Sequence, residues 1–427
     1  MNLDALLDVR MHGEVVSAVG TLAADATEHV IDVTGMIVAP GFIDVHVHLR
    51  EPGQEWKETI ATGTAAAAAG GFTTIFCMPN TEPALDSVVQ LEELKRRTDR
   101  DAVVSVRPIA AISEGRRGDT PVDYRALAAV GAVGFSDDGE STADSSVMRQ
   151  ALAASRELAL PVMVHCEDPT LTGGAMHEGY TSHALKIQGL PALAEESIIN
   201  RDIGLAALSG GWLHACHVST GRGADLIARA KSNGVRVTAE VMPHHMTMTD
   251  KWVGGRRDIE HEQGSDGEHF GAADQDTKVN PPLRTTGDML RLREALRAGL
   301  IDVIATDHAP HARHEKKGRS FMTAAFGLSG SEFALPLLLS LVRAGELTLR
   351  EVVRGLCTTP ARLWGLNVGT LRPGSPADVV VFDPAETWTP HLKGTISRGI
   401  NTPLLDTELH GRTKLAFVGG DERYRDW

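Results

Sequence analysis

Two histidines, His46 and His48, lie one residue apart in the apolar run "GFIDVHVHLR" (residues 41–50). Alternate side chains of a β-strand point to the same face, so both imidazoles can bind one ion from one side. Imidazole nitrogens are common ligands of zinc and of similar divalent ions. The alternative for this motif alone is an ordinary packed or hydrogen-bonded pair of histidines.

Several other apolar runs also end in polar groups. The residues at these ends are Asn80, Asp137, Asp138, His165, His217, His244, His245, Asp307 and His308. Asp307 in "IATDHAPH" is the most informative, because an unpaired carboxylate at the end of an apolar strand is costly to bury. A nearby metal ion would remove that cost and give the carboxylate a role as a base. The coincidence of these groups with the HxH motif favours a metal centre over packing.

The elements that must position these residues are short β-rich runs that alternate with helical patterns. The runs are 41–49, 73–78, 102–110, 132–138, 161–167, 212–218, 235–244 and 302–308. Helical spacing marks 57–69, 122–130, 144–158, 195–208, 222–232 and 287–298. Eight strand–helix units predict an α/β fold, a (β/α)8 TIM barrel over residues 41–365. The carboxyl ends of its strands would carry the active site.

Both ends of the chain have a different pattern. Residues 1–40 and 366–427 contain short alternating strands and turns such as "RPGSPADVVVFDP", with little helix. They predict one small β-sandwich domain built from both termini. The polar, Gly-rich stretch 246–284 is too long for a plain connection and is expected to be a functional loop or a mobile segment. A tolerated surface insertion is the alternative.

Composition excludes several classes of protein. The chain has 427 residues, 42% of them apolar, and a formal net charge of −14 without a basic stripe, which argues against nucleic acid or a membrane surface as partner. Its start lacks a signal-peptide pattern, and its apolar stretches are far shorter than the ~20 residues that span a bilayer. The four cysteines are widely spaced, as is typical of reduced thiols. We expect a cytoplasmic protein with a small-molecule substrate.

The motifs "DVHVHLREPG", "MPNT", "GFSDDG", "HCED", "HVST" and "TDHAPH" together resemble the amidohydrolase superfamily and, within it, the bacterial class I dihydroorotases. The resemblance covers essentially the whole chain. It implies a cyclic-amide hydrolase of pyrimidine biosynthesis that holds one or two Zn²⁺ ions per subunit. Such an enzyme reversibly closes N-carbamoyl-L-aspartate to (S)-dihydroorotate by means of a metal-activated hydroxide.

The same resemblance implies a role for each matching residue. His46, His48 and Asp307 would bind the first metal, and His165 and His217 the second. The chain has no lysine between Lys95 and Lys186 to supply a carboxylated bridging group. The bridge is therefore expected to be Asp138, with its neighbour Asp137 as the alternative. Asp307 would act as general base and then general acid. The implied substrate-binding residues are Arg50, Asn80, Asn280, His311, Phe326 and Gly327.

Other functions are also compatible with the sequence. A hydantoinase or allantoinase is the main alternative among enzymes, although the missing lysine and the acid-binding Arg50 count against it. A non-catalytic scaffold for aspartate transcarbamoylase should have lost its metal ligands, whereas this chain keeps them. The sequence leaves open the number and identity of the metal ions, homodimer formation and a complex of the active enzyme with aspartate transcarbamoylase.

Overall fold

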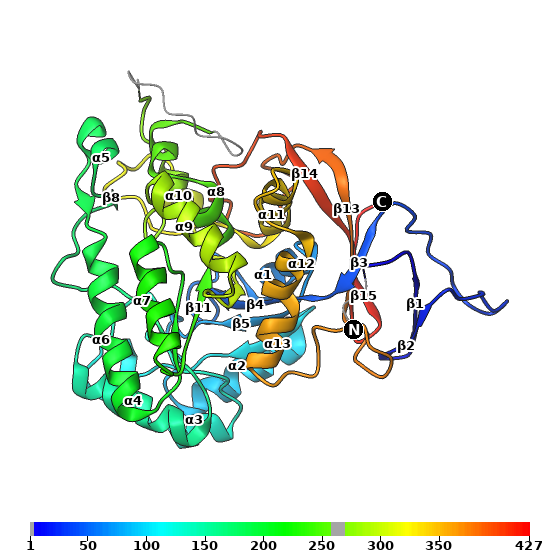
Figure 1. Cartoon of the computed structure of the whole chain (residues 1–427), viewed down its shortest axis with the longest axis horizontal. Helices are drawn as coiled ribbons and strands as arrows, with labels where there is room; N and C mark the ends of the chain where they lie inside the picture. The colour runs from blue at the N-terminus through cyan, green and yellow to red at the C-terminus, as the bar shows by residue number, and fades with distance from the viewer. Residues whose placement is uncertain (1–3, 258–269) are drawn as a thin grey trace.

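The structure, a computed structural model that describes residues 4–257 and 270–427, is a mixed α/β fold with short parallel strands at its centre (Figure 1). Every residue of β4 and β5 is buried, as expected for parallel strands that are covered on both faces and are therefore apolar along most of their length. The central strands are β4 (Phe42–Val47), β5 (Phe72–Cys77), β6 (Ser105–Pro108), β7 (Val162–Val164), β10 (Leu213–Ala215), β11 (Val237–Val241) and β12 (Val303–Ile304).

The parallel strand pairings form a ring that begins and ends at β4. β4, β5 and β6 pair in that order, and so do β7, β10, β11 and β12. Isolated parallel bridges from Phe135 to Ala110 and to Val162 connect β6 with β7. A bridge between Val47 and His308 connects β4 with the chain just beyond β12. The strand expected at 132–138 is limited to these bridges at Phe135, because the next backbone donors across from it bind the Asp137 side chain instead.

A buried carboxylate stabilises the contact between the first and last of these strands. Asp44 in β4 accepts hydrogen bonds from the backbone N–H and the hydroxyl of Thr306, and from the N–H of His46. Burial raises the pKa of Asp44 to about 6, against the opposing effect of the hydrogen bonds from Thr306. The cost of burying this carboxylate is offset by donors that would otherwise be unpaired.

Helices follow the strands and pack against one another in sequence order, α1 on α2, α2 on α3, and so on through α4, α6, α7 and α9. The longer helices are α1 (Ile60–Ala69), α2 (Val88–Asp101), α3 (Tyr124–Ala129), α4 (Ser145–Leu158), α6 (Leu193–Ser209), α7 (Gly221–Ser232), α9 (Thr286–Arg297) and α11 (Ala334–Arg343). Each expected helical segment overlaps one of them, whereas α2 and α11 were expected only as members of the eight strand–helix units and not by residue range. Side chains of Thr59, Asp144, Thr220 and Thr285 cap the first turns of α1, α4, α7 and α9.

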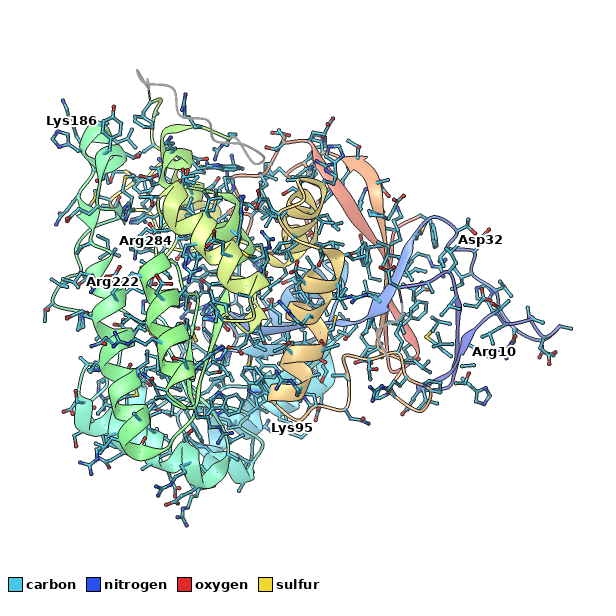
Figure 2. The ribbon with its side chains drawn as sticks, in the orientation of Figure 1. Arg10, Asp32, Lys95, Lys186, Arg222 and Arg284 are labelled. Atoms are coloured by element: carbon cyan, nitrogen blue, oxygen red, sulfur yellow. The ribbon has the colours of Figure 1, made fainter. Side chains whose placement is uncertain are left out.

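Strands from both ends of the chain lie together at one side of the molecule (Figure 1). β3 (Ile37–Pro40) pairs antiparallel with β13 (Val379–Trp388), which pairs with β14 (Leu409–Val418) and through it with β15 (Asp421–Arg425). β1 (Asp8–His12) and β2 (Val15–Gly20) form a separate two-stranded sheet. Val16 of β2 shares one apolar cluster with Val379, Val381 and Leu415. Figure 2 shows Arg10 and Asp32 at this end of the molecule.

The described parts of the 246–284 stretch are packed against the rest of the fold. α8 (Pro243–Thr247) and two short 3-10 turns, Asp250–Gly254 and Gln275–Thr277, lie in it or at its start. Trp252 and Val279 are buried in a cluster with Leu337 of α11. Residues 258–269 lie outside the described residues, so the expected mobility of this stretch stays a prediction.

The remaining short elements are α5 (Tyr180–Leu185), α10 (Arg313–Lys316), α12 (Leu349–Val353), α13 (Thr359–Leu363), β8 (Met176–His177), β9 (Gly189–Leu190), the 3-10 turns Glu114–Arg116 and Ser331–Phe333, and one π-helical turn, Arg354–Thr358. No helix in the described part of the chain is long and apolar enough to cross a membrane.

Candidate metal centre and neighbouring residues

Four histidines and two aspartates meet at the carboxyl ends of the central strands. Asp138 lies between them: its Oδ1 is 3.5 Å from His46 Nε2 and 3.4 Å from His217 Nε2, and its Oδ2 is 3.5 Å from His48 Nε2. Asp307 Oδ1 is 3.0 Å from His48 Nε2 and 3.6 Å from His46 Nε2. The structure therefore brings together residues that are far apart in the sequence, as the strand-end pattern predicts.

His165 joins this cluster through Nδ1, whereas His46, His48 and His217 face it with Nε2. Its Nδ1 lies 2.9 Å from His217 Nε2 and 3.7 Å from Asp138 Oδ1. Its Nε2 contacts Glu167 Oε2 at 3.3 Å and Asn280 Nδ2 at 3.3 Å. When Nε2–H donates to Glu167, Nδ1 keeps its lone pair and faces Asp138, and the Asn280 amide lies beside Nε2.

The donor set of this cluster fits a divalent cation. His46 Nε2 and Asp138 Oδ1 are buried and have no hydrogen-bond partner among the described residues. His46, Asp138 and His217, and likewise His46, His48 and Asp307, each offer ligand atoms within 4.8 Å of one another. Buried imidazole and carboxylate groups are stabilised when they coordinate a metal, and this N/O combination suits zinc and similar ions.

Glu240 in β11, a residue that sequence reasoning missed, fixes the direction of His46. Its Oε1 lies 2.6 Å from His46 Nδ1, and its Oε2 lies 3.1 Å from His214 Nε2. If His214 donates from Nε2, its Nδ1 accepts from the Thr238 hydroxyl, whose oxygen accepts the Trp212 indole N–H. Burial raises the pKa of Glu240, but the hydrogen bonds from His214 and His46 act against it, and the pKa lies well below its usual value. With Nδ1–H bound to Glu240, the lone pair of His46 Nε2 is directed at the cluster.

The backbone at three site residues is held in an uncommon conformation. Arg50, His217 and Asp307 have φ values of 61°, 33° and 48°, in the left-handed region that L-residues rarely adopt. The N–H of His217 donates to Glu240, and those of Ser219 and Thr220 donate to the buried Glu195. These contacts hold the turn that carries His217.

Asp137 and Asp138 have different surroundings. Asp137 accepts hydrogen bonds from the N–H groups of Ile112 and Ser113 and from the hydroxyls of Ser113 and Thr142. Its carboxylate is therefore used within the loops around it, whereas that of Asp138 faces the histidines.

Arg50 is a buried cation beside the cluster. Its guanidinium donates to the carbonyl of Pro310 and contacts His311 Nε2 at 3.4 Å. Burial lowers the pKa of Arg50 to about 10, which still leaves it charged at neutral pH. Burial also lowers the pKa of His311 to about 3, so that ring is neutral. In residues 4–257 and 270–427, no carboxylate oxygen lies within 4.0 Å of the Arg50 guanidinium.

Several of the other implied substrate residues contact the cluster or Arg50. Asn80 Oδ1 binds His48 Nδ1 at 2.8 Å, which leaves its amide nitrogen as a donor. Asn280 Oδ1 is buried without a partner in the described part of the chain. Gly327 N–H donates to the carbonyl of Lys278, and Phe326 is 36% exposed. Asn401, which sequence reasoning also missed, binds the N–H of His311 and the carbonyl of Gly327.

Solved structures similar to this chain are enzymes that act on cyclic amides. An L-hydantoinase (dihydropyrimidinase) from Arthrobacter aurescens has a TM-score of 0.83 and 25% identity, and the match covers 97% of this chain and 92% of that one. A D-hydantoinase (dihydropyrimidinase) from Thermus sp. has a TM-score of 0.80 and 27% identity, with 98% and 92% covered. The fold and the buried cluster define this chain as a metal-dependent cyclic amidohydrolase.

Proteins related in sequence identify the family within this class of enzymes. A family model described as dihydro-orotase-like matches residues 35–222. A dihydroorotase from Syntrophus aciditrophicus is 41% identical over 428 residues, covering 100% of this chain and 96% of that protein. A dihydroorotase from Anaeromyxobacter dehalogenans (strain 2CP-1 / ATCC BAA-258) is 44% identical over 391 residues, covering 91% and 87%. The chain belongs to the dihydroorotase family, as the motifs predicted.

The two adjacent aspartates should respond differently to replacement by asparagine. Asp138→Asn should lose bound metal, because an amide is a poor substitute for a carboxylate between two groups of ligands. Asp137→Asn should keep the metal but lose about 1–3 kcal/mol of stability, because its buried donors lose a charged acceptor. Metal analysis and unfolding of the chelator-treated proteins measure both effects. Loss of metal in the Asp137 variant alone would reverse the assignment.

Glu240→Gln tests the orientation of His46. An amide can still fill the space but no longer accepts from both histidines, so the affinity for metal should fall by ~10–100-fold. Competition with a chelating dye measures the dissociation constant. Glu408→Gln, at an exposed position, is the control and should bind metal like the wild type. Unchanged affinity in Glu240→Gln would show that Glu240 does not orient His46.

Proposed function

We propose that this chain catalyses the reversible cyclisation of N-carbamoyl-L-aspartate to (S)-dihydroorotate, a step of de novo pyrimidine biosynthesis, as the names of its relatives suggest. The observation that carries the proposal is Arg50. A buried cation with no carboxylate partner in the described residues is costly, and a carboxylate on the substrate would remove that cost. Dihydroorotate carries such a group.

We infer that the metal is Zn²⁺, with one or two ions per subunit. His46, His48 and Asp307 would hold one ion and His165 and His217 the other, with Asp138 shared between them. When bound, the ions polarise the amide carbonyl and make the attacking water more acidic. Class I membership within the amidohydrolase superfamily fits a bridge made by Asp138, because the sequence has no lysine between Lys95 and Lys186.

In this proposal the protein's own groups bind the substrate and move the proton. Arg50, Asn80 and His311 bind the substrate carboxylate, with Arg50 supplying the charge. Asn280 and the backbone at Phe326 and Gly327 contact the ring. Asp307 accepts a proton from the attacking water and delivers it to the ring nitrogen as the amide bond breaks, and it reverses both transfers during cyclisation.

We propose that residues 41–365 form a (β/α)8 TIM barrel and that 1–40 with 366–427 form a composite β-sandwich domain. The ring of parallel pairings supports the first part. The sheet that joins β3 to β13, and the apolar cluster it shares with β2, support the second. The four free, buried cysteines favour a cytoplasmic location. A homodimer and a complex with aspartate transcarbamoylase stay predictions.

A hydantoinase-like activity is the second candidate, because the solved neighbours carry that name. Neutral cyclic amides have no carboxylate for Arg50 to bind, so Arg50 favours dihydroorotate. A non-catalytic scaffold is the third candidate, and the complete ligand set argues against it.

The substrate assignment is tested by two rings that differ in one group. Metal-loaded protein should open dihydroorotate in preference to 5,6-dihydrouracil, which lacks the carboxylate. Arg50→Ala should weaken the interaction with dihydroorotate by roughly 2–5 kcal/mol, the cost of unpairing a buried charge, and should leave dihydrouracil unaffected. Steady-state kinetics for both rings provide the measurement. A wild-type protein that ignores dihydroorotate but opens neutral rings contradicts the assignment.

Asp307→Asn separates proton transfer from metal binding. The amide keeps nearly the same volume and can approach the metal through its oxygen, so the fold and much of the metal content should survive. Turnover should fall by at least ~100-fold, the low end of what general acid–base catalysis contributes. Metal content and kcat are measured on the same preparation. If the metal-loaded variant kept a tenth or more of wild-type turnover, another group would carry the proton, with His308 the nearest candidate.

A further inference from the structure

Two buried lysines, Lys278 and Lys316, lie beneath the loops that carry the proposed substrate contacts. Their exposed fractions are 2% and 1%. Within residues 4–257 and 270–427, no carboxylate oxygen lies within 4.0 Å of either Nζ atom. Burying an ammonium group without a counter-ion is costly unless its N–H groups find other acceptors. Here the acceptors are backbone carbonyls of neighbouring loops.

Lys278 binds the loop of residues 320–327. Its Nζ donates to the carbonyls of Met322 at 2.9 Å and Ala324 at 2.7 Å. The same Nζ lies 4.1 Å from the centre of the Phe326 ring, within the range of a cation–π contact. Lys278 therefore joins the segment that leads to Asn280 with the loop that carries Phe326.

Lys316, the last residue of α10, binds the segment of Lys278 from the other side. Its Nζ donates to the carbonyls of Gln275 at 3.0 Å and Lys278 at 2.9 Å. The Lys278 carbonyl also accepts the N–H of Gly327 at 2.9 Å. Three segments are thus held together, namely the one before Asn280, the one after His311 and the one that ends at Gly327.

We propose that Lys278 and Lys316 are positioning residues that fix the spacing of the substrate-binding loops. This inference rests on the proposed function, because it assigns substrate contacts to Asn280, His311, Phe326 and Gly327. An apolar side chain in place of Lys278 leaves the carbonyls of Met322 and Ala324 without this donor, and one in place of Lys316 removes its links to Gln275 and Lys278, so the loops are freed from each other. Neither Nζ contacts the cluster of histidines and aspartates, so binding of the substrate should change while the metal and the proton transfer stay intact.

The test replaces each lysine by methionine, which keeps an unbranched stem and removes the donors. Lys278→Met and Lys316→Met should each raise KM for dihydroorotate by about tenfold, the equivalent of one hydrogen bond to a charged group. The value of kcat should stay within a factor of about three, because the variants lose interactions that stabilise the bound substrate and the transition state equally. Metal content should be unchanged. Lys278→Arg, which keeps a charged donor, should recover part of the loss.

Lys95→Met is the matched control. Lys95, labelled in Figure 2, lies on α2 with a side chain that is 68% exposed, and its replacement should leave KM unchanged. The double variant Lys278→Met, Lys316→Met should raise KM by less than the product of the single effects, because both lysines hold the same segments. A purely structural role would lower the melting temperature and the active fraction and leave KM unchanged, which would overturn the proposal.

Hydrogen–deuterium exchange on the wild-type protein tests the proposal without a variant and therefore does not depend on whether a variant folds. Amides of 275–280 and 320–327, Gly327 included, should open with the same free energy, because the lysines make them one unit. Independent opening of the two segments would overturn the proposal. A wild type that leaves dihydroorotate unchanged would contradict the proposed function instead, and the exchange result would still decide whether the lysines join the loops.

Discussion

The hydrogen bond between His46 Nδ1 and Glu240 Oε1 determines how the rest of the site can be used. It leaves His46 Nε2 without a partner in the described residues and directs it at Asp138, whose Oδ1 is also unpaired. Glu240 is in turn held by His214, which binds Thr238, so a chain of satisfied polar groups extends away from the cluster into the centre of the fold. Satisfied networks of this kind orient metal ligands, because a buried carboxylate accepts the ring N–H and leaves the other nitrogen free.

The buried charged groups of this site differ in how their charge is compensated. Asp44 and Glu240 are buried carboxylates with donors on every side, whereas Arg50 is a buried cation whose described partners are a carbonyl and an imidazole. The first two hold the strands and the ligands in place. In the described residues no carboxylate oxygen lies within 4.0 Å of the Arg50 guanidinium, and this difference is the physical reason to expect an anionic substrate. The fold is shared with hydantoinases, so in the proposed function the preference for a carboxylate depends on this one side chain.

The sequence was sufficient to predict which strand ends would meet. His46, His48, His165, His217 and Asp307 were expected together because each ends an apolar run, and parallel strands bring such ends to one edge. Six helices also overlap their expected segments to within two residues at most ends. Sequence reasoning did not find Glu240, Glu195, Asn401, Lys278 or Lys316, since their importance depends on contacts between distant segments and not on local pattern. Glu240 lies inside an expected strand, where its alternation with Val241 is only a weak indication of its role.

The sequence could not distinguish Asp137 from Asp138 as the residue that faces the histidines, because adjacent residues of a strand face opposite ways and a register shift of one residue exchanges them. The strand expected at 132–138 is shorter in the structure, because the N–H groups of Ile112 and Ser113 donate to the Asp137 side chain and not to the backbone of a longer strand.

Anomalous X-ray diffraction from crystals of the zinc-loaded protein tests the central claim most directly, since it locates each ion without reference to activity. The account predicts anomalous density between His46, His48 and Asp307 and, when a second ion is bound, between His165 and His217, with Asp138 in contact with both. Cys216, His46 and Glu240 form a rival group of ligands within 4.8 Å of one another, on the other side of the His46 ring. Density at that group, with Glu240 as a ligand in place of a hydrogen-bond partner of His46, would contradict the account.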